Sequence, residues 1–363
     1  MITWNNLDTL DSYKELSKAS RVNLAEVMSG ENGAERVKNY SIPMAEGFSY
    51  NYAAKAVDDD VLDALVKLAK EAQLAEKFKA LYNGEVVNTG EKRLVLHHMT
   101  RGQLGDAVNA DGVDKRAFYV EQQNRIADFA NKVHAGEITN AAGEKFTTVV
   151  QIGIGGSDLG PRAMYLALEN WAKKNNTFKM EAKFISNVDP DDAAAVLNSI
   201  DVAHSIFVLV SKSGTTLETL TNESFVKDAL KKAGLDASKH MIAVTSETSP
   251  LAKSDDYLAA FFMDDYIGGR FSSTSAVGGA VLSLAFGPEV FARFLEGAAA
   301  EDKLSANEDV LKNPEKEIWI FLRAFRSRFV MKRKDIRRLP AVTVLRSIQE
   351  NCSSLTVTAQ KRY

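Results

Sequence analysis

The sequence has 363 residues, of which 45% are hydrophobic and 26% are charged, and its net charge is −3; this composition is typical of a globular protein and excludes a disordered one. No apolar run approaches the roughly 20 residues of a membrane span, and the amino terminus lacks the basic and apolar regions of a secretory signal. The single cysteine, Cys352, excludes a disulfide framework and a cysteine-based zinc site. We therefore expect a soluble cytoplasmic protein of roughly two or three domains, without a membrane partner.

The first 120 residues indicate a helical and acidic region. Between residues 58 and 81, valine, leucine and alanine recur at the spacing of one helix face. We expect a helix across this stretch, within a helical amino-terminal region.

From residue 146 the pattern changes to alternating strands and helices. Short runs rich in β-branched and apolar residues predict strands over 146–152, 182–185, 205–210 and 241–245. Helices are expected between them, over 161–174, 191–200 and 216–233, and Pro161 is expected near the first turn of its helix, where its missing N–H costs little. Apolar strands that alternate with helices favour an α/β fold with a doubly wound parallel sheet.

A glycine-rich segment, residues 153–160, follows the first of these strands. Its glycines allow a tight turn close to a ligand, and Ser157 offers a hydroxyl near the start of a helix. A dinucleotide site would need a third glycine at position 158, where Asp158 would repel a pyrophosphate. A tight turn without a ligand is the structural alternative.

A second segment, residues 211–216, has the sequence Ser-Lys-Ser-Gly-Thr-Thr and again lies between a strand and a helix. Four hydroxyls and the ammonium of Lys212 beside backbone N–H groups are suited to one phosphate group. The segment is not a nucleotide-binding P-loop, because Lys212 lies on the wrong side of Gly214. A simple helix cap needs one such hydroxyl rather than four.

A third segment, residues 265–278, places Arg270 directly after Gly268 and Gly269. A fixed guanidinium beside backbone N–H groups can stabilise charge that develops on a reacting oxygen. Without its context, such an arginine is more commonly the partner of a surface ion pair.

Residues 265–278 match every specified position of the signature D-x-[LIVM]-G-G-R-[FY]-S-x-x-[ST]-[AC]-[LIVM]-G, and in this they resemble the phosphoglucose isomerase family. The two preceding loops resemble the sugar-phosphate loops of the same family. Residues 88–97 resemble its amino-terminal N-x-T-E-x-R-x-V-L-H region, except that Gly90 stands where that pattern has threonine. The resemblance extends from about residue 40 to about residue 310.

The resemblance implies the interconversion of glucose 6-phosphate and fructose 6-phosphate through a cis-enediolate, in a homodimer that needs neither a metal nor an organic cofactor. The phosphate and sugar would contact a set of loop residues: Gly156, Ser157, Asp158, Ser211, Lys212, Ser213, Gly214, Thr215 and Thr216. Gly269 and Arg270 would stabilise the enediolate. A non-catalytic module that senses phosphosugars is the alternative function.

Three elements of the family are not recognisable in this sequence. They are the glutamate that acts as general base, the histidine that opens the sugar ring and a lysine near the carboxyl terminus. The last histidine, His240, precedes Arg270, and Glu350 has no positional argument in its favour. The activity of this chain is therefore open.

The resemblance implies four regions. Residues 1–120 would be the helical amino-terminal region, 121–290 the first sugar-isomerase (SIS) domain with a flavodoxin-like sheet, 291–320 a linker helix and 321–363 a basic tail that is not a native domain. The second SIS domain would be absent or scrambled.

The tail carries 11 basic and 2 acidic residues, in contrast to the acidic chain before it. A helix that binds nucleic acid and a solvated tail are two interpretations. We favour a third, a shift of the reading frame near residue 318, because the resemblance and the composition change together. No nucleic-acid partner is expected.

Overall fold

The computed structural model describes residues 1–19, 22–110 and 112–313, and these form two compact units. The first unit comprises residues 1–98, 103–106 and the described residues from 297 onward, and the second comprises 99–102 and 107–296. The expected boundaries after residues 120 and 290 fall inside α6 (Lys115–Ala135) and α11 (Pro288–Ser305). The expected tail, residues 321–363, lies outside the described residues.

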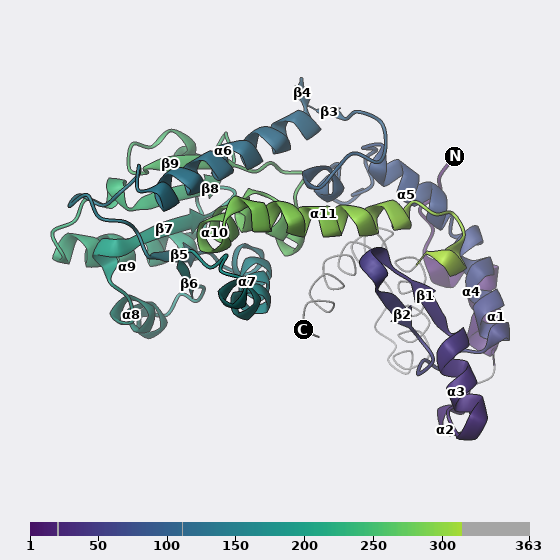
Figure 1. Cartoon of the computed structure of the whole chain (residues 1–363). Helices are drawn as coiled ribbons and strands as arrows, with labels where there is room; N and C mark the ends of the chain where they lie inside the picture. Colours follow the sequence, from purple (N-terminus) through teal and green to yellow (C-terminus); the bar gives the residue numbers. More distant parts are fainter. Residues whose placement is uncertain (20–21, 111, 314–363) are drawn as a thin grey trace. The chain divides into compact units, whose positions relative to one another are not determined.

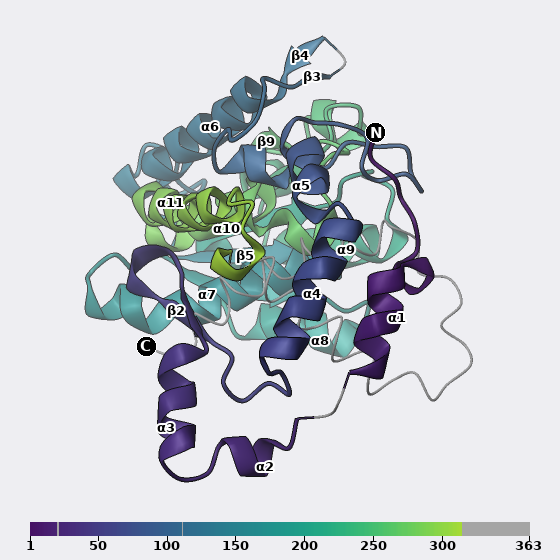
Figure 2. The same cartoon turned by 90° about the vertical axis from the view of Figure 1, so that its right-hand side faces the viewer.

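The first unit is mostly helical. Its elements are α1 (Asp11–Lys18), α2 (Leu24–Val27), α3 (Gly30–Asn39), β1 (Ser41–Pro43), β2 (Ser49–Asn51), α4 (Asp59–Glu71), α5 (Leu74–Tyr82) and the end of α11. The helix expected across residues 58–81 is in fact two helices, because Gln73 adopts a left-handed backbone conformation (φ 55°). Leu16, Leu65 and Leu68 lie in the core of this unit, and α1 packs alongside α4 (Figure 2).

The second unit contains the expected parallel sheet (Figure 1). Its strands are β5 (Thr148–Ile152), β6 (Glu181–Ile185), β7 (Ser205–Val210), β8 (Met241–Thr245) and β9 (Ala259–Phe262), in the spatial order β6-β5-β7-β8-β9. Every neighbouring pair is parallel. The order is that of a flavodoxin-like sheet, so the predicted α/β class is confirmed. The β3–β4 ribbon (Asn109–Ala110 and Val113–Asp114) precedes α6.

Helices cover both faces of the sheet. The apolar core on one face includes residues of α6, α7 (Gly156–Lys174), α10 (Ala276–Phe286) and the start of α11, and the core on the other face includes residues of α8 (Pro190–Asn198) and α9 (Leu217–Lys232). Val149 faces the first of these cores and Val150 the second, because side chains alternate along a strand. Burial on both faces explains why the strands are apolar without alternation.

The sequence analysis missed β9 and α10, although both are strongly apolar. β9 is only four residues long, and every residue of α10 is buried, so α10 lacks the polar face that marks an amphipathic helix. Among residues 1–19, 22–110 and 112–313, no helix combines the length and apolar character that crossing a bilayer requires.

The start of α7 differs from the prediction in a way that matters for the site. The helix begins at Gly156, not at Pro161, so the proline lies inside the helix. A proline there has no N–H for the carbonyl four residues earlier, that of Ser157. The side-chain amide of Gln151 donates to this carbonyl instead, with 2.6 Å between Nε2 and O.

A buried ion pair anchors the segment that follows β9. Lys115 Nζ lies 3.3 Å from Asp264 Oδ2, and the two side chains are 7% and 15% exposed. Tyr119 donates its hydroxyl to the same carboxylate at 2.9 Å, and the N–H of Tyr266 donates at 3.1 Å. Burial raises the pKa of the Asp264 carboxyl, whereas the Lys115 ammonium opposes this rise. The base of the 264–275 segment is thus fixed to α6.

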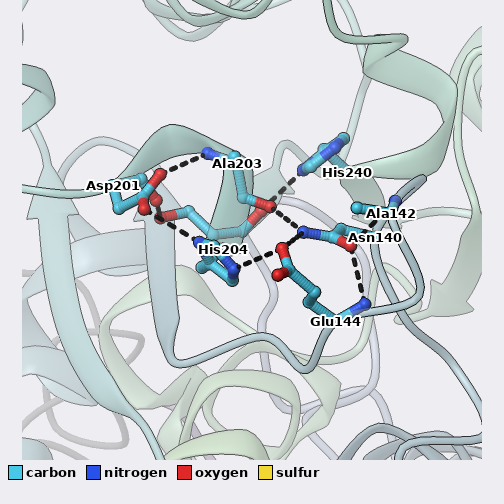
Figure 3. Close-up of polar contacts among 8 residues, drawn as sticks. Asn140, Ala142, Glu144, Asp201, Ala203, His204 and His240 are labelled. Atoms are coloured by element: carbon cyan, nitrogen blue, oxygen red, sulfur yellow. Dashed lines mark hydrogen bonds and ion pairs between the residues drawn. The ribbon is translucent and has the colours of Figure 1, made fainter.

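A polar cluster around His204 lies at the amino-terminal ends of β5 and β7, at the other end of the sheet from Asp264 (Figure 3). His204 contacts two carboxylates, with Nδ1 2.8 Å from Asp201 and Nε2 2.9 Å from Glu144. The side chain of Asn140 forms hydrogen bonds with two backbone groups. It accepts from the Glu144 N–H at 2.9 Å and donates to the Ala203 carbonyl at 3.1 Å. The cluster ties the segment before β5 to the segment before β7.

The His204 cluster predicts a pH-dependent stability. The Asp201 and Glu144 carboxylates raise the pKa of His204, the contact with Asp201 contributing most. A raised pKa in the folded state stabilises the protein below the unfolded pKa of about 6.5, and this contribution is lost as the pH rises through the folded value. We expect His204→Gln to lower the melting temperature near pH 6 but to have little effect near pH 9. An equal effect at both pH values would contradict this account.

The Asp264 anchor predicts a large loss of stability when one partner is removed. Asp264→Asn leaves the Lys115 ammonium buried without its counter-charge, so we expect the free energy of unfolding to fall by about 3 kcal/mol. Asp128→Asn is the control, because it breaks an exposed ion pair with Lys132 on the same helix, and we expect its effect to stay below about 1 kcal/mol. Denaturant titrations that find equal effects would contradict the proposed anchor.

Candidate functional site

The three polar segments lie at the carboxyl ends of the strands in the second unit. Residues 153–160 follow β5 and residues 211–216 follow β7, and these two strands are neighbours. The chain leaves β5 toward β6 on one side and β7 toward β8 on the other, so the two segments flank the point where the strand order reverses. Open α/β sheets bind their ligands at this point.

The first segment approaches the third at van der Waals distance. A Cβ added to Gly156 would lie 2.2 Å from the carbonyl carbon of Gly269. At this spacing of the two backbones, no residue with a side chain fits at position 156. The Ser272 hydroxyl closes the contact, donating to the Gly269 carbonyl at 2.8 Å and lying 3.2 Å from the Gly156 carbonyl. Gly155 takes a positive φ of 60° immediately before the helix. This backbone contact explains why position 156 is a glycine.

The second segment folds through its own hydroxyls. Ser211 Oγ accepts from the Gly214 N–H at 3.2 Å and donates to Thr216 Oγ1 at 3.3 Å. The hydroxyl of Thr215 donates to Ser213 Oγ at 3.0 Å, and both of these residues are exposed. Gly214 has a φ of 68°, which glycine adopts without strain. The loop thus presents exposed hydroxyls on a fixed backbone.

Lys212 connects the second segment to the third. Its ammonium donates to the Ile267 carbonyl at 3.0 Å and lies 3.8 Å from Asp265 Oδ1. Its side chain remains about one-third exposed, while Gly269 and Arg270 lie exposed at the start of a 3₁₀ helix, Gly269–Thr274. These contacts therefore join all three segments that the sequence singled out.

The helices behind the first two segments differ at their amino ends from their neighbours. The side chains of Asp114, Asp189 and Ser275 cap α6, α8 and α10. In the part of the chain that the structure describes, the residues preceding α7 and α9, Gly155 and Thr216, make no side-chain capping bond. The amino end of a helix carries partial positive charge and N–H donors that suit an anion.

Asp158 has a contact within the protein. It is 4% exposed, and its Oδ1 lies 2.9 Å from Nε and 2.8 Å from Nη2 of Arg162. Burial raises the pKa of the Asp158 carboxyl, and the arginine opposes this rise. The arginine also donates to Ser186 at 2.7 Å. Asp158 therefore supports the first turn of α7 through Arg162.

Sequence reasoning missed residues that hold the site together. Gln151 interrupts an otherwise apolar strand, and Asp264 directly precedes the matched signature; these were the available signals. His204 and His240 lie at the other end of the sheet (Figure 3). No group of three or more His, Cys, Asp or Glu side chains within the described ranges could hold a metal ion.

The chain is similar to one family of known proteins over most of its length. The phosphoglucose isomerase family model matches residues 51–331. A glucose-6-phosphate isomerase of Treponema denticola is 57% identical over 315 residues, which is 85% of this chain and 59% of that protein. One of Treponema pallidum (strain Nichols) is 50% identical over 86% of this chain and 59% of its own length.

A solved structure supports the same assignment. The crystal structure of a glucose-6-phosphate isomerase from Chlamydia trachomatis matches 89% of this chain and 61% of its own chain, with a TM-score of 0.78 and 36% sequence identity. The chain thus spans about three-fifths of the length of these relatives. Since the family model covers more than half of its residues, the chain belongs to the phosphoglucose isomerase family.

Proposed function

We propose that this chain contributes the phosphosugar-binding part of a glucose-6-phosphate isomerase, which interconverts glucose 6-phosphate and fructose 6-phosphate. The observation that carries the proposal is the convergence of the three segments at the carboxyl ends of β5, β7 and β9, beside two helix amino ends without capping side chains. Relatives named glucose-6-phosphate isomerase over 85–86% of the chain support it. A homodimer in the cytoplasm is part of the same proposal.

The phosphate is assigned to the first two segments. Ser157, Ser213 and Thr216 provide hydroxyls, together with Ser211, whose buried hydroxyl also holds the loop through Gly214 and Thr216. The amino ends of α7 and α9 provide N–H donors and partial positive charge. Gly156 and Gly214 complete this surface without adding a side chain to either turn, and Thr215 adds an exposed hydroxyl. Asp158 supports it from behind through its contact with Arg162.

The reacting end of the sugar is assigned to the third segment. Isomerisation moves a proton between C1 and C2 through a cis-enediolate, whose oxygens carry negative charge. The Arg270 guanidinium and the Gly269 N–H would stabilise that charge; removing one such donor typically costs about 3–4 kcal/mol. Lys212 would lie beside the sugar, held by the Ile267 carbonyl. The proton transfer also needs a carboxylate base, which no residue of this chain is assigned to supply.

The binding step can be tested with the purified chain. We expect titration calorimetry to detect glucose 6-phosphate and fructose 6-phosphate but neither free sugar, because the phosphate supplies most of the contacts. Ser213→Ala should weaken binding about tenfold, the value of one charge-assisted hydrogen bond of roughly 1.4 kcal/mol. Ser224→Ala, an exposed serine on α9, is the matched control and should leave affinity unchanged. Equal affinity for sugars with and without phosphate would contradict the assignment.

Catalysis can be tested in deuterated water. Equilibration of the two hexose phosphates with deuterium incorporation at C2, followed by NMR, is the expected result if the chain holds or recruits the base. Arg270→Ala should then slow it about 10²–10³-fold. Binding without exchange at C2 would favour the non-catalytic sensor over the enzyme.

The contact between Gly156 and Gly269 predicts a steric effect. Gly156→Ala would place a Cβ against the Gly269 backbone, so we expect about 1–3 kcal/mol of lost stability together with weaker hexose phosphate binding. Gly297→Ala on α11 is the control, since its Cβ would meet no described atom within 4 Å; alanine should be neutral there or stabilise by about 0.5–1 kcal/mol. A melting temperature of Gly156→Ala equal to wild type would contradict the close contact.

A further inference from the structure

The first turn of α7 contains a backbone carbonyl that the helix itself cannot fully satisfy. Pro161 lies inside the helix and has no N–H, so the carbonyl of Ser157 loses its usual donor four residues ahead. This carbonyl belongs to the residue whose hydroxyl is assigned to the phosphate. Whatever holds the carbonyl therefore holds the phosphate-binding serine as well.

Gln151 supplies the missing donor from the neighbouring strand. Its Nε2 lies 2.6 Å from the Ser157 carbonyl oxygen, and because a carbonyl can only accept, the amide nitrogen must point toward it. Gln151 is 1% exposed and lies within β5, one residue before the strand ends. The hydrogen bond thus runs from the sheet to the first helical turn.

The oxygen of the Gln151 side-chain amide is less well placed than its nitrogen. Among the residues that the structure describes, Oε1 of Gln151 has no hydrogen-bond partner and is buried. Leaving a buried oxygen without a hydrogen-bond partner lowers the stability of the folded state. The nearest β5 residues, Val149, Val150 and Ile152, are apolar and fully buried, so an apolar side chain would also suit the strand at 151. The Ser157 carbonyl is the feature that calls for an amide.

The geometry around Ser157 leaves little room for the turn to shift without consequence. A Cβ added to Gly153 would lie 2.8 Å from the Ser157 carbonyl oxygen, so the strand end and the turn are in contact. The adjacent Gly156 contacts Gly269 and its carbonyl lies 3.2 Å from the Ser272 hydroxyl. A displaced first turn would therefore also displace the segment that carries Arg270.

We propose that Gln151 is a positioning residue that replaces the N–H removed by Pro161 and fixes the first turn of α7 for phosphate binding. The proposal rests on the proposed function in one respect, that the group bound at this turn is the phosphate of a hexose 6-phosphate. Gln151 acts through Ser157 and does not touch the ligand.

A double-mutant cycle separates positioning from mere packing. Gln151→Met keeps a side chain of similar length and removes the donor, whereas Pro161→Ala returns a backbone N–H to the helix. We expect Gln151→Met to weaken hexose 6-phosphate binding about tenfold, Pro161→Ala to change it little, and the combined variant to recover most of the affinity. A structural defect in the core would not be repaired by Pro161→Ala.

Hydrogen exchange provides a readout that needs no ligand. In Gln151→Met, the backbone amides of residues 157–160 should exchange at least about tenfold faster than in wild type, and the combined variant should restore their protection. Thr177→Val is the matched control: it also removes a buried oxygen without a described partner, but beyond the other end of α7, and should leave these amides unchanged.

Two results would overturn the proposal. One is unchanged exchange at residues 157–160 in Gln151→Met; the other is a loss of protection that Pro161→Ala fails to repair. If exchange follows the expected cycle while wild type binds no hexose 6-phosphate, the positioning role stands and the proposed function fails. The two failures are therefore distinguishable.

Discussion

The backbone contact between Gly156 and Gly269 is the constraint on which the candidate site depends. It brings the start of α7 against the 3₁₀ helix at Gly269–Thr274 at a distance that no side chain permits. The segment after β7 reaches the same place through Lys212, which binds the Ile267 carbonyl. Contacts between residues 116 and 55 positions apart in the sequence in this way join the three segments at one edge of the sheet.

Sequence patterns predicted the sheet more accurately than the helices. The strands at 205–210 and 241–245 match β7 and β8 at both ends, because strands buried on both faces are continuous apolar runs with clear limits. The start of α7 was misplaced, since proline usually marks a first turn. Pro161 lies deeper in the helix, and the side-chain amide of Gln151 that replaces its missing N–H comes from another element. The break at Gln73 was missed because a single left-handed residue leaves no mark on apolar spacing.

The site could be predicted as a set of motifs but not as an arrangement. The hydroxyls of residues 211–216 and the glycines before Arg270 are local patterns with a chemical meaning, so the sequence identified them. The supports of those motifs lie on separate elements: Asp264 is paired with Lys115 of α6, and Gln151 of β5 donates to the Ser157 carbonyl. Such contacts depend on which elements become neighbours, and one sequence does not state this.

The amino ends of α7 and α9 have no capping side chains, and this links the stability of the fold to the composition of the solution. Water, a backbone carbonyl or an anion can complete a helix end that has no capping side chain, and an anion that binds only the folded state adds stability that rises with the logarithm of its concentration. We therefore expect the stability of the second unit to depend on the anions in solution, so that its melting temperature is best compared between buffers of the same anion content.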